Sequence, residues 1–333
     1  ACSSHRQPGR RSRPRLRRYY PGLEASDREG EPFHTHKSDW YLETLSQLPW
    51  NKETEDIHDL RRAQKLLDES HFGMQIIKDR ILEFLAVQQL TDNTGNAPVL
   101  WFLATPGTGK TTLSRGIASA LGRKFIRISL AAMGDIHQIK GRAHTSPDAE
   151  PGQIIKQICR AGVRNPVILF DEIDKMTGGI GSSEMMATFL EILDPEQNYA
   201  FADHYIDYPY DLSHVLFLAS ANKIAEGEGP LINRMELITF PDYSRDEKRT
   251  IGEKYILPKI LKSTGLTPEH GYKVELTPET WIRLIDPFKW DSGMRTMQHN
   301  LGAMVNKMAR ESIETGRKEF IITPENIRNY ILV

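Results

Sequence analysis

The sequence has few cysteines and no long apolar segment, and both features narrow the possible classes of protein. Only two of its 333 residues are cysteines, Cys2 and Cys159. Two widely separated thiols form neither a disulfide framework nor a cysteine metal cluster, so we expect a reducing compartment. No apolar run approaches the roughly 20 residues that a membrane-spanning helix requires, so we expect no membrane partner.

The chain also lacks an excess of charge of one sign. Its 43 Lys and Arg residues nearly balance its 44 Asp and Glu residues, which gives a net charge of −1 and no general attraction to nucleic acid or anionic membranes. The exception is the segment 1–18, which has seven arginines and no acidic residue. Such a segment is typical of an organellar targeting sequence or of a disordered basic arm, and its composition leaves both open.

The pattern along the chain predicts four regions. Residues 1–37 are rich in Arg, Pro, Gly and Ser and are expected to be disordered. Helical spacing of apolar residues predicts a helical linker over 38–69. Residues 70–243 alternate short apolar runs with helical patterns, which predicts an α/β fold with a parallel sheet and helices on both faces. From about residue 244 to 333 the strand patterns stop, so we expect a small helical subdomain. The apolar runs that predict strands are 99–103, 125–128, 167–170 and 215–219.

A glycine-rich segment follows the first predicted strand. It reads Ala104-Thr105-Pro106-Gly107-Thr108-Gly109-Lys110-Thr111-Thr112 and leads into a helical pattern. The segment fits the P-loop pattern G-x-x-x-x-G-K-[ST] except that Ala104 replaces the first glycine, which is tolerated where φ is negative. In a P-loop the backbone N–H groups surround phosphates at a helix N-terminus. Lys110 would reach the β- and γ-phosphates and the Thr111 hydroxyl would bind Mg²⁺.

Polar residues follow two later predicted strands. Asp171 and Glu172 come directly after the run 167–170, and Asn222 follows the run 215–219. In an open parallel sheet, ligands bind beyond the carboxyl ends of the strands. Asp171 would therefore hold Mg²⁺, directly or through water, and Glu172 would activate the attacking water. Asn222 would hydrogen-bond the water and the γ-phosphate. The structural alternatives are a solvated acidic turn for Asp171 and Glu172 and a turn-forming role for Asn222.

These motifs, together with several others, resemble the AAA+ ATPase module of the Lon family of ATP-dependent proteases. The resemblance runs from about Asp39 to Arg310. It is carried most strongly by Leu193-Asp194-Pro195-Glu196-Gln197-Asn198, Asp203-His204-Tyr205 and Pro209-Tyr210-Asp211-Leu212-Ser213, and further by Leu48-Pro49-Trp50, Arg62-Ala63-Gln64, His71-Phe72-Gly73-Met74 and Asp171-Glu172-Ile173-Asp174-Lys175-Met176.

The resemblance implies a hexameric ring of identical subunits that binds ATP and Mg²⁺ between subunits. By this likeness Asn222 corresponds to the sensor 1 residue, Arg234 to the arginine finger of the neighbouring subunit's site, and Arg295 to the sensor 2 arginine. Phe72 and the adjacent Gly73 would flank the adenine. Without the resemblance, either arginine would be an ordinary surface residue.

Two features depart from the Lon pattern. Lon proteins continue into a proteolytic domain with a Ser–Lys dyad, and the segment after Arg295 is too short to contain it, so we expect no peptidase activity from this chain alone. Lon proteins also carry an aromatic–aliphatic pair in a substrate-gripping loop, where this chain has Ser146 and Pro147. An aromatic ring gives apolar grip on a polypeptide and Ser-Pro does not, although His137 or Met133 could supply another contact.

The sequence therefore predicts an ATPase serving ATP-dependent protein unfolding or degradation, with a protein substrate and a protease domain or subunit as partners. The alternative is a degenerate relative that acts as a nucleotide-gated scaffold or regulator. A third class is a nucleic-acid-associated ATPase that uses the arginine-rich arm; the neutral net charge and the lack of a second basic patch with aromatic residues weigh against it. The arm and the resemblance together favour the mitochondrial matrix, with cytoplasm and peroxisome as alternatives.

Overall fold

The chain divides into two compact units, Ala1–Thr44 and Leu45–Val333. The computed structural model describes residues 32–91, 98–131, 133–178, 182–224, 234–285 and 293–331. The predicted arginine-rich arm lies outside the described residues up to residue 31. The first described helix, α2 (Pro32–Gln47), begins inside the segment 1–37 for which we expected disorder. Pro32 is compatible with this start, because the first N–H groups of a helix have no intrahelical partner. Among the helices of the described residues, none combines the length and the apolar character needed to cross a bilayer.

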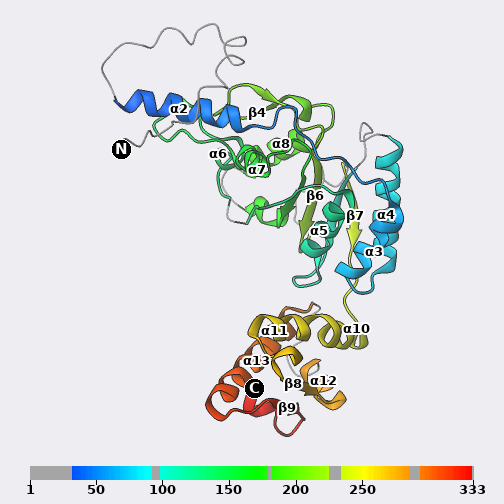
Figure 1. Cartoon of the computed structure of the whole chain (residues 1–333). Coiled ribbons are helices and arrows are strands. Elements are labelled where there is room, and N and C mark those ends of the chain that lie inside the picture. The colour runs from blue at the N-terminus through cyan, green and yellow to red at the C-terminus, as the bar shows by residue number, and fades with distance from the viewer. Residues whose placement is uncertain are drawn as a thin grey trace, which may run out of the picture. The chain divides into compact units, whose positions relative to one another are not determined.

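A five-stranded parallel sheet forms the centre of the second unit, and four of its strands are those that the sequence predicted. Its strand order is β2-β3-β6-β1-β7, and all neighbouring strands are parallel. Every residue of β3 and β6 is buried, because helices cover both faces of the sheet (Figure 1). The strand β7 was not predicted, since its run is only partly apolar. The strands are β1 (Val99–Leu103), β2 (Phe125–Ser129), β3 (Val167–Asp171), β6 (Leu216–Ala221) and β7 (Met235–Thr239).

The register of this sheet brings three strand ends to one edge. Leu103, the last residue of β1, pairs with Ala221 of β6, and Phe170 of β3 pairs with Ala219 of β6. The segments that follow β1, β3 and β6 therefore leave the sheet side by side. These are the three segments in which the sequence placed the candidate site residues.

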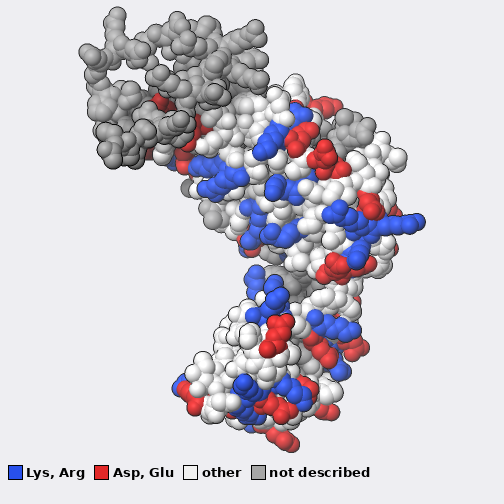
Figure 2. Space-filling view, in the orientation of Figure 1, with Lys and Arg blue, Asp and Glu red and all other residues white. Residues whose placement is uncertain are grey.

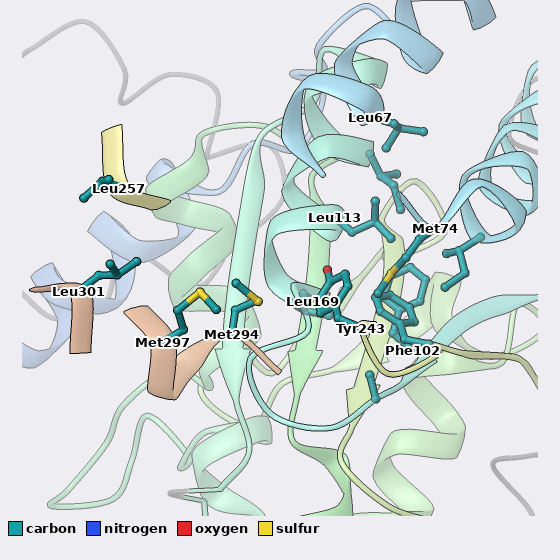
Figure 3. Close-up of a cluster of buried hydrophobic side chains, with 14 of the residues drawn as sticks. Leu67, Met74, Phe102, Leu113, Leu169, Tyr243, Leu257, Met294, Met297 and Leu301 are labelled. Carbon is teal, nitrogen blue, oxygen red and sulfur yellow. The ribbon is translucent and has the colours of Figure 1, made fainter. Parts of the chain in front are cut away.

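Helical segments surround the sheet or precede it in the part of the chain that the structure describes. Helix α5 packs its buried Leu113 and Ile117 against the sheet, and Figure 3 shows Leu113 in one cluster with Phe102 and Leu169 from the strands and Leu67 from α3. Their burial fixes the helix that starts at the P-loop against the strands that carry the acidic residues. The segments are α3 (Leu60–Ser70), α4 (Gln75–Leu90), α5 (Lys110–Leu121), α6 (His137–Lys140), α7 (Gln153–Ala161), the 3₁₀ segment η1 (Ile173–Gly178) and α8 (Ser182–Leu193).

The C-terminal region after residue 244 is mainly helical, but it also contains two strands. β8 (Lys273–Leu276) and β9 (Glu319–Ile322) form a parallel two-stranded sheet, so the prediction that strands stop at about residue 244 was wrong. Each strand has only four residues, too few for the alternation of apolar residues to stand out in the sequence. The helices are α10 (Arg245–Ile251), the π-helical segment η3 (Gly252–Ile256), α11 (Leu257–Thr264), α12 (Pro278–Ile285), α13 (Arg295–Thr315) and α14 (Ile327–Tyr330).

Candidate nucleotide-binding site

The segment between β1 and α5 forms a loop at a helix N-terminus, as a P-loop requires. Gly107 and Gly109 have φ angles of 85° and 99°, which residues with a Cβ rarely adopt. Lys110 begins α5, so the first N–H groups of that helix point toward the loop. Ala104 is not among the residues with positive φ, and its N–H donates to the carbonyl oxygen of Ala221 on β6 (3.1 Å). Alanine therefore fits the first position of this loop.

The remaining loop residues differ in exposure. Thr108 is buried, and its hydroxyl donates to the carbonyl oxygen of Thr105 (2.8 Å), which ties the loop to itself. Pro106 is exposed at the tip of the loop. Thr111 is half-buried in the first turn of α5, and Thr112 is exposed. The Thr111 hydroxyl, which the sequence predicts to bind Mg²⁺, therefore lies half-buried in the first turn of α5.

The ammonium group of Lys110 lies at the meeting point of two strand ends. It donates to the side-chain oxygen of Asn222 (2.9 Å) and to the carbonyl oxygens of Ala104 and Thr105. Burial lowers the pKa of Lys110, while the negative charges of Asp171 and other carboxylates act in the opposite direction. Lys110 and Asn222 are far apart in the sequence, and the parallel sheet brings them into contact.

Asp171 ends β3 and is almost fully buried, at 5% exposure. One carboxylate oxygen accepts a hydrogen bond from the Ser220 hydroxyl on the neighbouring strand β6. The other oxygen accepts from the guanidinium group of Arg127 on β2, whose Nε and Nη2 both lie at 2.6 Å. Both neighbouring strands thus fix the orientation of this carboxylate.

Glu172 follows directly and has a left-handed backbone, with φ of 64°. Such a conformation is uncommon for a residue other than glycine and is found in turns and at functional sites. The side chain is half-buried. The 3₁₀ segment η1 that follows also contacts the chain just after β6, since Asp174 accepts a hydrogen bond from the backbone N–H of Asn222 (3.3 Å).

Of the two candidate arginines, Arg295 lies at the P-loop. It begins α13, and a Cβ built on Gly107 would lie 3.0 Å from its backbone nitrogen. The N–H of the preceding Met294 donates to the carbonyl oxygen of Gly107 (3.1 Å). The C-terminal helical region thus contacts the loop directly, through the start of α13.

Arg234 is bound to a different part of the fold. Its guanidinium forms an ion pair with Asp194 (3.0 Å) just after α8, and it donates to the carbonyl oxygen of Leu190 (3.3 Å). Its side chain is 43% exposed. Among the described residues, its ion pair and hydrogen bond involve the end of α8 and not the P-loop or the acidic pair.

The predicted adenine-flanking residues lie between α3 and the C-terminal region. The Phe72 ring packs against the ring of Tyr255 in η3, with 6.0 Å between centroids. Gly73 has a φ of 69°, and a Cβ there would lie 3.1 Å from the Glu247 carboxylate of α10. The sequence did not single out Tyr255, because a lone tyrosine in a helical pattern carries no signal of a binding site.

The sequence analysis also missed Arg127 and Ser220. The only signal for Arg127 was a charged residue between the apolar Ile126 and Ile128 of a strand, and for Ser220 a hydroxyl near the end of an otherwise apolar run. Among the described residues, no group of three or more His, Cys, Asp or Glu side chains is arranged to hold a metal. Mg²⁺ in nucleotide sites takes few protein ligands besides phosphate and water, and the oxygen donors Thr111 and Asp171 suit it.

The predicted substrate-gripping loop forms a short antiparallel turn. Arg142 and Glu150 form a β-bridge, and between them Ser146 is half-buried and Pro147 is exposed. His137 is exposed and Met133 is half-buried on the chain before this turn. The turn carries no Phe, Tyr or Trp.

Comparison with known proteins agrees with this geometry. Residues 100–243 match the family described as ATPase family associated with various cellular activities (AAA). The chain is 42% identical over 291 residues to Lon protease 1 of Bacillus subtilis, covering 87% of this chain and 37% of that protein. It is 41% identical over 303 residues to Lon protease 2 of Thermus thermophilus (87% of this chain, 37% of that protein), and 40% identical over 291 residues to Lon protease 2 of Herpetosiphon aurantiacus (87% and 35%).

The chain therefore spans little more than a third of the length of these relatives. The matched AAA region begins in β1 and ends at Tyr243, so it contains the P-loop, the acidic pair and Asn222. Sequence, fold and relatives together assign the chain to the Lon-type AAA+ ATPase modules.

Proposed function

We propose that this chain hydrolyses ATP with Mg²⁺ and drives protein unfolding for degradation in a Lon-type system. The observation that carries the proposal is the convergence of three strand ends, where Lys110 lies 2.9 Å from the amide oxygen of Asn222 after β6 and the oriented carboxylate of Asp171 comes from β3, on the other side of β6 from β1. A cation, an amide and a carboxylate beside a loop of backbone N–H groups form the set that phosphoryl transfer requires.

The binding roles follow from position. The loop N–H groups and Lys110 would hold the phosphates, with the positive end of α5 adding to the attraction. Phe72 and Gly73 would flank the adenine. Thr111 and Asp171 would hold Mg²⁺, and a bound Mg²⁺ would neutralise charge on the β- and γ-phosphates.

The hydrolytic roles belong to residues next to these. Glu172 would take the proton of the attacking water, and Asn222 would orient that water. Arg295, at the P-loop, would sense the nucleotide from the C-terminal region. Arg234 would act on the nucleotide of a neighbouring subunit, with Asp194 holding its guanidinium at the surface. This division of roles requires a homo-oligomer, for which the family resemblance implies a hexameric ring.

The test is steady-state ATP hydrolysis measured against protein concentration, for the unaltered chain and for Glu172→Gln. Specific activity should rise with concentration, because Arg234 completes a neighbour's site. Glu172→Gln should keep ATP binding and lose turnover by about 10²–10⁴-fold, the usual contribution of a general base. Glu279→Gln, an exposed glutamate at the start of α12, is the matched control and should leave turnover unchanged.

A chain that binds ATP and shows no turnover at any concentration would contradict the ATPase proposal. Turnover that is independent of concentration would instead contradict the role of Arg234. If Glu172→Gln kept full activity, the water-activating base would lie elsewhere.

A second function, a nucleotide-gated scaffold or regulator, is favoured by the turn at Ser146 and Pro147. This turn offers no aromatic ring to grip a polypeptide. An unfolded substrate such as casein should then stimulate ATP hydrolysis less than twofold. Strong stimulation by casein would favour a translocating motor and would point to another gripping residue, such as His137.

Three further assignments complete the proposal. We assign peptide-bond cleavage to a protease domain or subunit outside residues 1–333. We keep the mitochondrial matrix as the proposed location on the strength of the arginine-rich arm, while the relatives reported above are bacterial. Nucleic acid remains a weaker candidate partner, since acidic side chains lie among the basic ones on the face shown in Figure 2.

A further inference from the structure

A buried histidine outside the predicted site packs directly against the P-loop. His71 follows the end of α3 and is 7% exposed. A Cβ built on Gly109 would lie only 2.0 Å from Cε1 of His71. The imidazole therefore fills the space that a side chain at Gly109 would occupy. Position 109 therefore requires glycine both because of this close approach and because of its φ of 99°.

A tyrosine joins this histidine to the backbone of the loop. The Tyr243 hydroxyl lies 2.7 Å from Nε2 of His71 and donates to the carbonyl oxygen of Thr108 at 2.9 Å. Tyr243 and Thr108 are 5% and 1% exposed, so water does not compete for these bonds. Figure 3 shows the Tyr243 ring close to Phe102 within the buried cluster.

The position of the protons follows from this arrangement. The Tyr243 hydroxyl has one proton, which it gives to the Thr108 carbonyl, so Nε2–H of His71 must donate to the tyrosine oxygen. Burial, with a smaller contribution from the charge of Lys78, lowers the pKa of His71 to about 4. The ring is therefore neutral at ordinary pH and carries its proton on Nε2, which fixes the direction of the chain of hydrogen bonds.

The chain of hydrogen bonds joins three parts of the fold. His71 caps α3, where its backbone N–H donates to Leu67 (3.0 Å). Tyr243 directly precedes Ser244, the N-cap of α10, and Ser244 forms a capping box with Glu247. The N-terminus of α10 is therefore fixed at Ser244, the residue next to the tyrosine that bonds the P-loop.

We propose that His71 and Tyr243 are positioning residues that hold the Thr108–Gly109 peptide in its phosphate-binding conformation and connect that conformation to the start of α10. The proposal rests on the proposed ATP site and names two residues that act on it without touching the nucleotide. Their loss should weaken ATP binding more than it slows hydrolysis, because Lys110, Glu172 and Asn222 stay in place once the loop is filled.

The test variant is Tyr243→Phe, which removes one oxygen atom and keeps the buried ring. We expect the dissociation constant for a fluorescent ATP analogue to rise about tenfold, equivalent to about 1.4 kcal/mol, since the Thr108 carbonyl loses its donor. The kcat at saturating ATP should change less than threefold while KM rises. The matched control is Tyr330→Phe, which removes a hydroxyl that donates to Glu311 (2.7 Å) elsewhere in the C-terminal region, and it should keep the affinity of the unaltered chain.

Two histidine variants complete the experiment. His71→Gln retains an N–H donor of similar reach and should recover part of the affinity, whereas His71→Ala should bind at least as weakly as Tyr243→Phe. Should His71→Ala fail to fold, the tyrosine and glutamine variants still decide the question.

Unchanged ATP affinity in Tyr243→Phe would overturn the inference, as would an equal loss in Tyr330→Phe, which would indicate general destabilisation. A fall in kcat with an unchanged KM would also overturn it. If the unaltered chain itself failed to bind the analogue, the proposed ATP site would be wrong, and the inference would fall with it.

Discussion

We expect acidification to destabilise the fold through the imidazole of His71. The unfolded chain binds a proton at this side chain with an ordinary pKa of 6.5, whereas burial lowers the pKa in the folded chain to about 4. Between these values the unfolded state holds more protons than the folded state. The stability that depends on the neutral ring is therefore present in full above pH 6.5, decreases as the pH falls, and is lost by about pH 4.

The magnitude follows from the two pKa values. Each unit of difference corresponds to about 1.36 kcal/mol. Between about pH 7.5 and about pH 4.5 the folded chain should lose about 2.5 kcal/mol of unfolding free energy at this one side chain. This is a large part of the 5–15 kcal/mol that is typical of a folded domain.

A second buried group acts in the opposite direction. Burial raises the pKa of Asp203 from 3.8 to about 6, although the N–H groups of Gly152, Tyr205 and Ile206 bond its carboxylate. The folded state then holds more protons than the unfolded state between these values. Acidification over this range adds about 2 kcal/mol of stability at Asp203. In the unaltered chain the contributions of His71 and Asp203 therefore nearly cancel.

The assay must separate the two groups. We would measure chemical denaturation at a series of pH values for the unaltered chain, for His71→Gln and for Asp203→Asn. The difference in unfolding free energy between the unaltered chain and His71→Gln should shrink by about 2.5 kcal/mol from about pH 7.5 to about pH 4.5, since the contribution of Asp203 is common to both. The corresponding difference for Asp203→Asn should change with the opposite sign. A His71→Gln difference that stays constant over this range would refute the buried neutral imidazole.

Two substitutions test packing elsewhere in the fold. Gly152→Ala should lower stability by about 2 kcal/mol or more, because the added Cβ would lie 1.9 Å from the carbonyl oxygen of Ile139. Gly302→Ala should be neutral or slightly stabilising in thermal melting, because a Cβ there would meet no atom within 4 Å outside its own stretch of helix. Arg123→Met should cost about 3–5 kcal/mol, since it leaves the buried Asp56 carboxylate without the guanidinium that bonds both of its oxygens. Adding Asp56→Asn should recover much of that loss, and a double variant no more stable than Arg123→Met would contradict this reasoning.

The candidate site residues that could be identified from the sequence belong to motifs of consecutive residues. The P-loop is recognisable because its glycines, Lys110 and Thr111 lie between an apolar run and a helical pattern, and that local order dictates a loop at a helix N-terminus. The acidic pair Asp171–Glu172 is recognisable for a similar reason, because it directly follows the apolar run 167–170. Parallel pairing was predictable from the alternation of strands and helices, and the structure has it.

Short or irregular elements escaped the sequence analysis. β8 and β9 have four residues each, and β7 contains Glu236 and Thr239, so none of them produces a clear apolar period. Their strand conformation depends on partners that are distant along the chain. β7 pairs with β1, and β8 with β9.

The sequence by itself determined the parallel α/β fold and the two motifs that bind phosphate and carry the acids, because each depends on neighbouring residues. Only the tertiary structure decided which side chains meet there. Arg127 and Ser220 reach Asp171 from two strands, Asn222 reaches Lys110, and Tyr243 bonds the loop beside His71. These contacts join residues separated by 44 to 172 positions. The contacts at Asp171 and Lys110 exist because parallel strands end at one edge of a sheet, and the contact at His71 exists because the end of α3 packs against the P-loop, which no local pattern records.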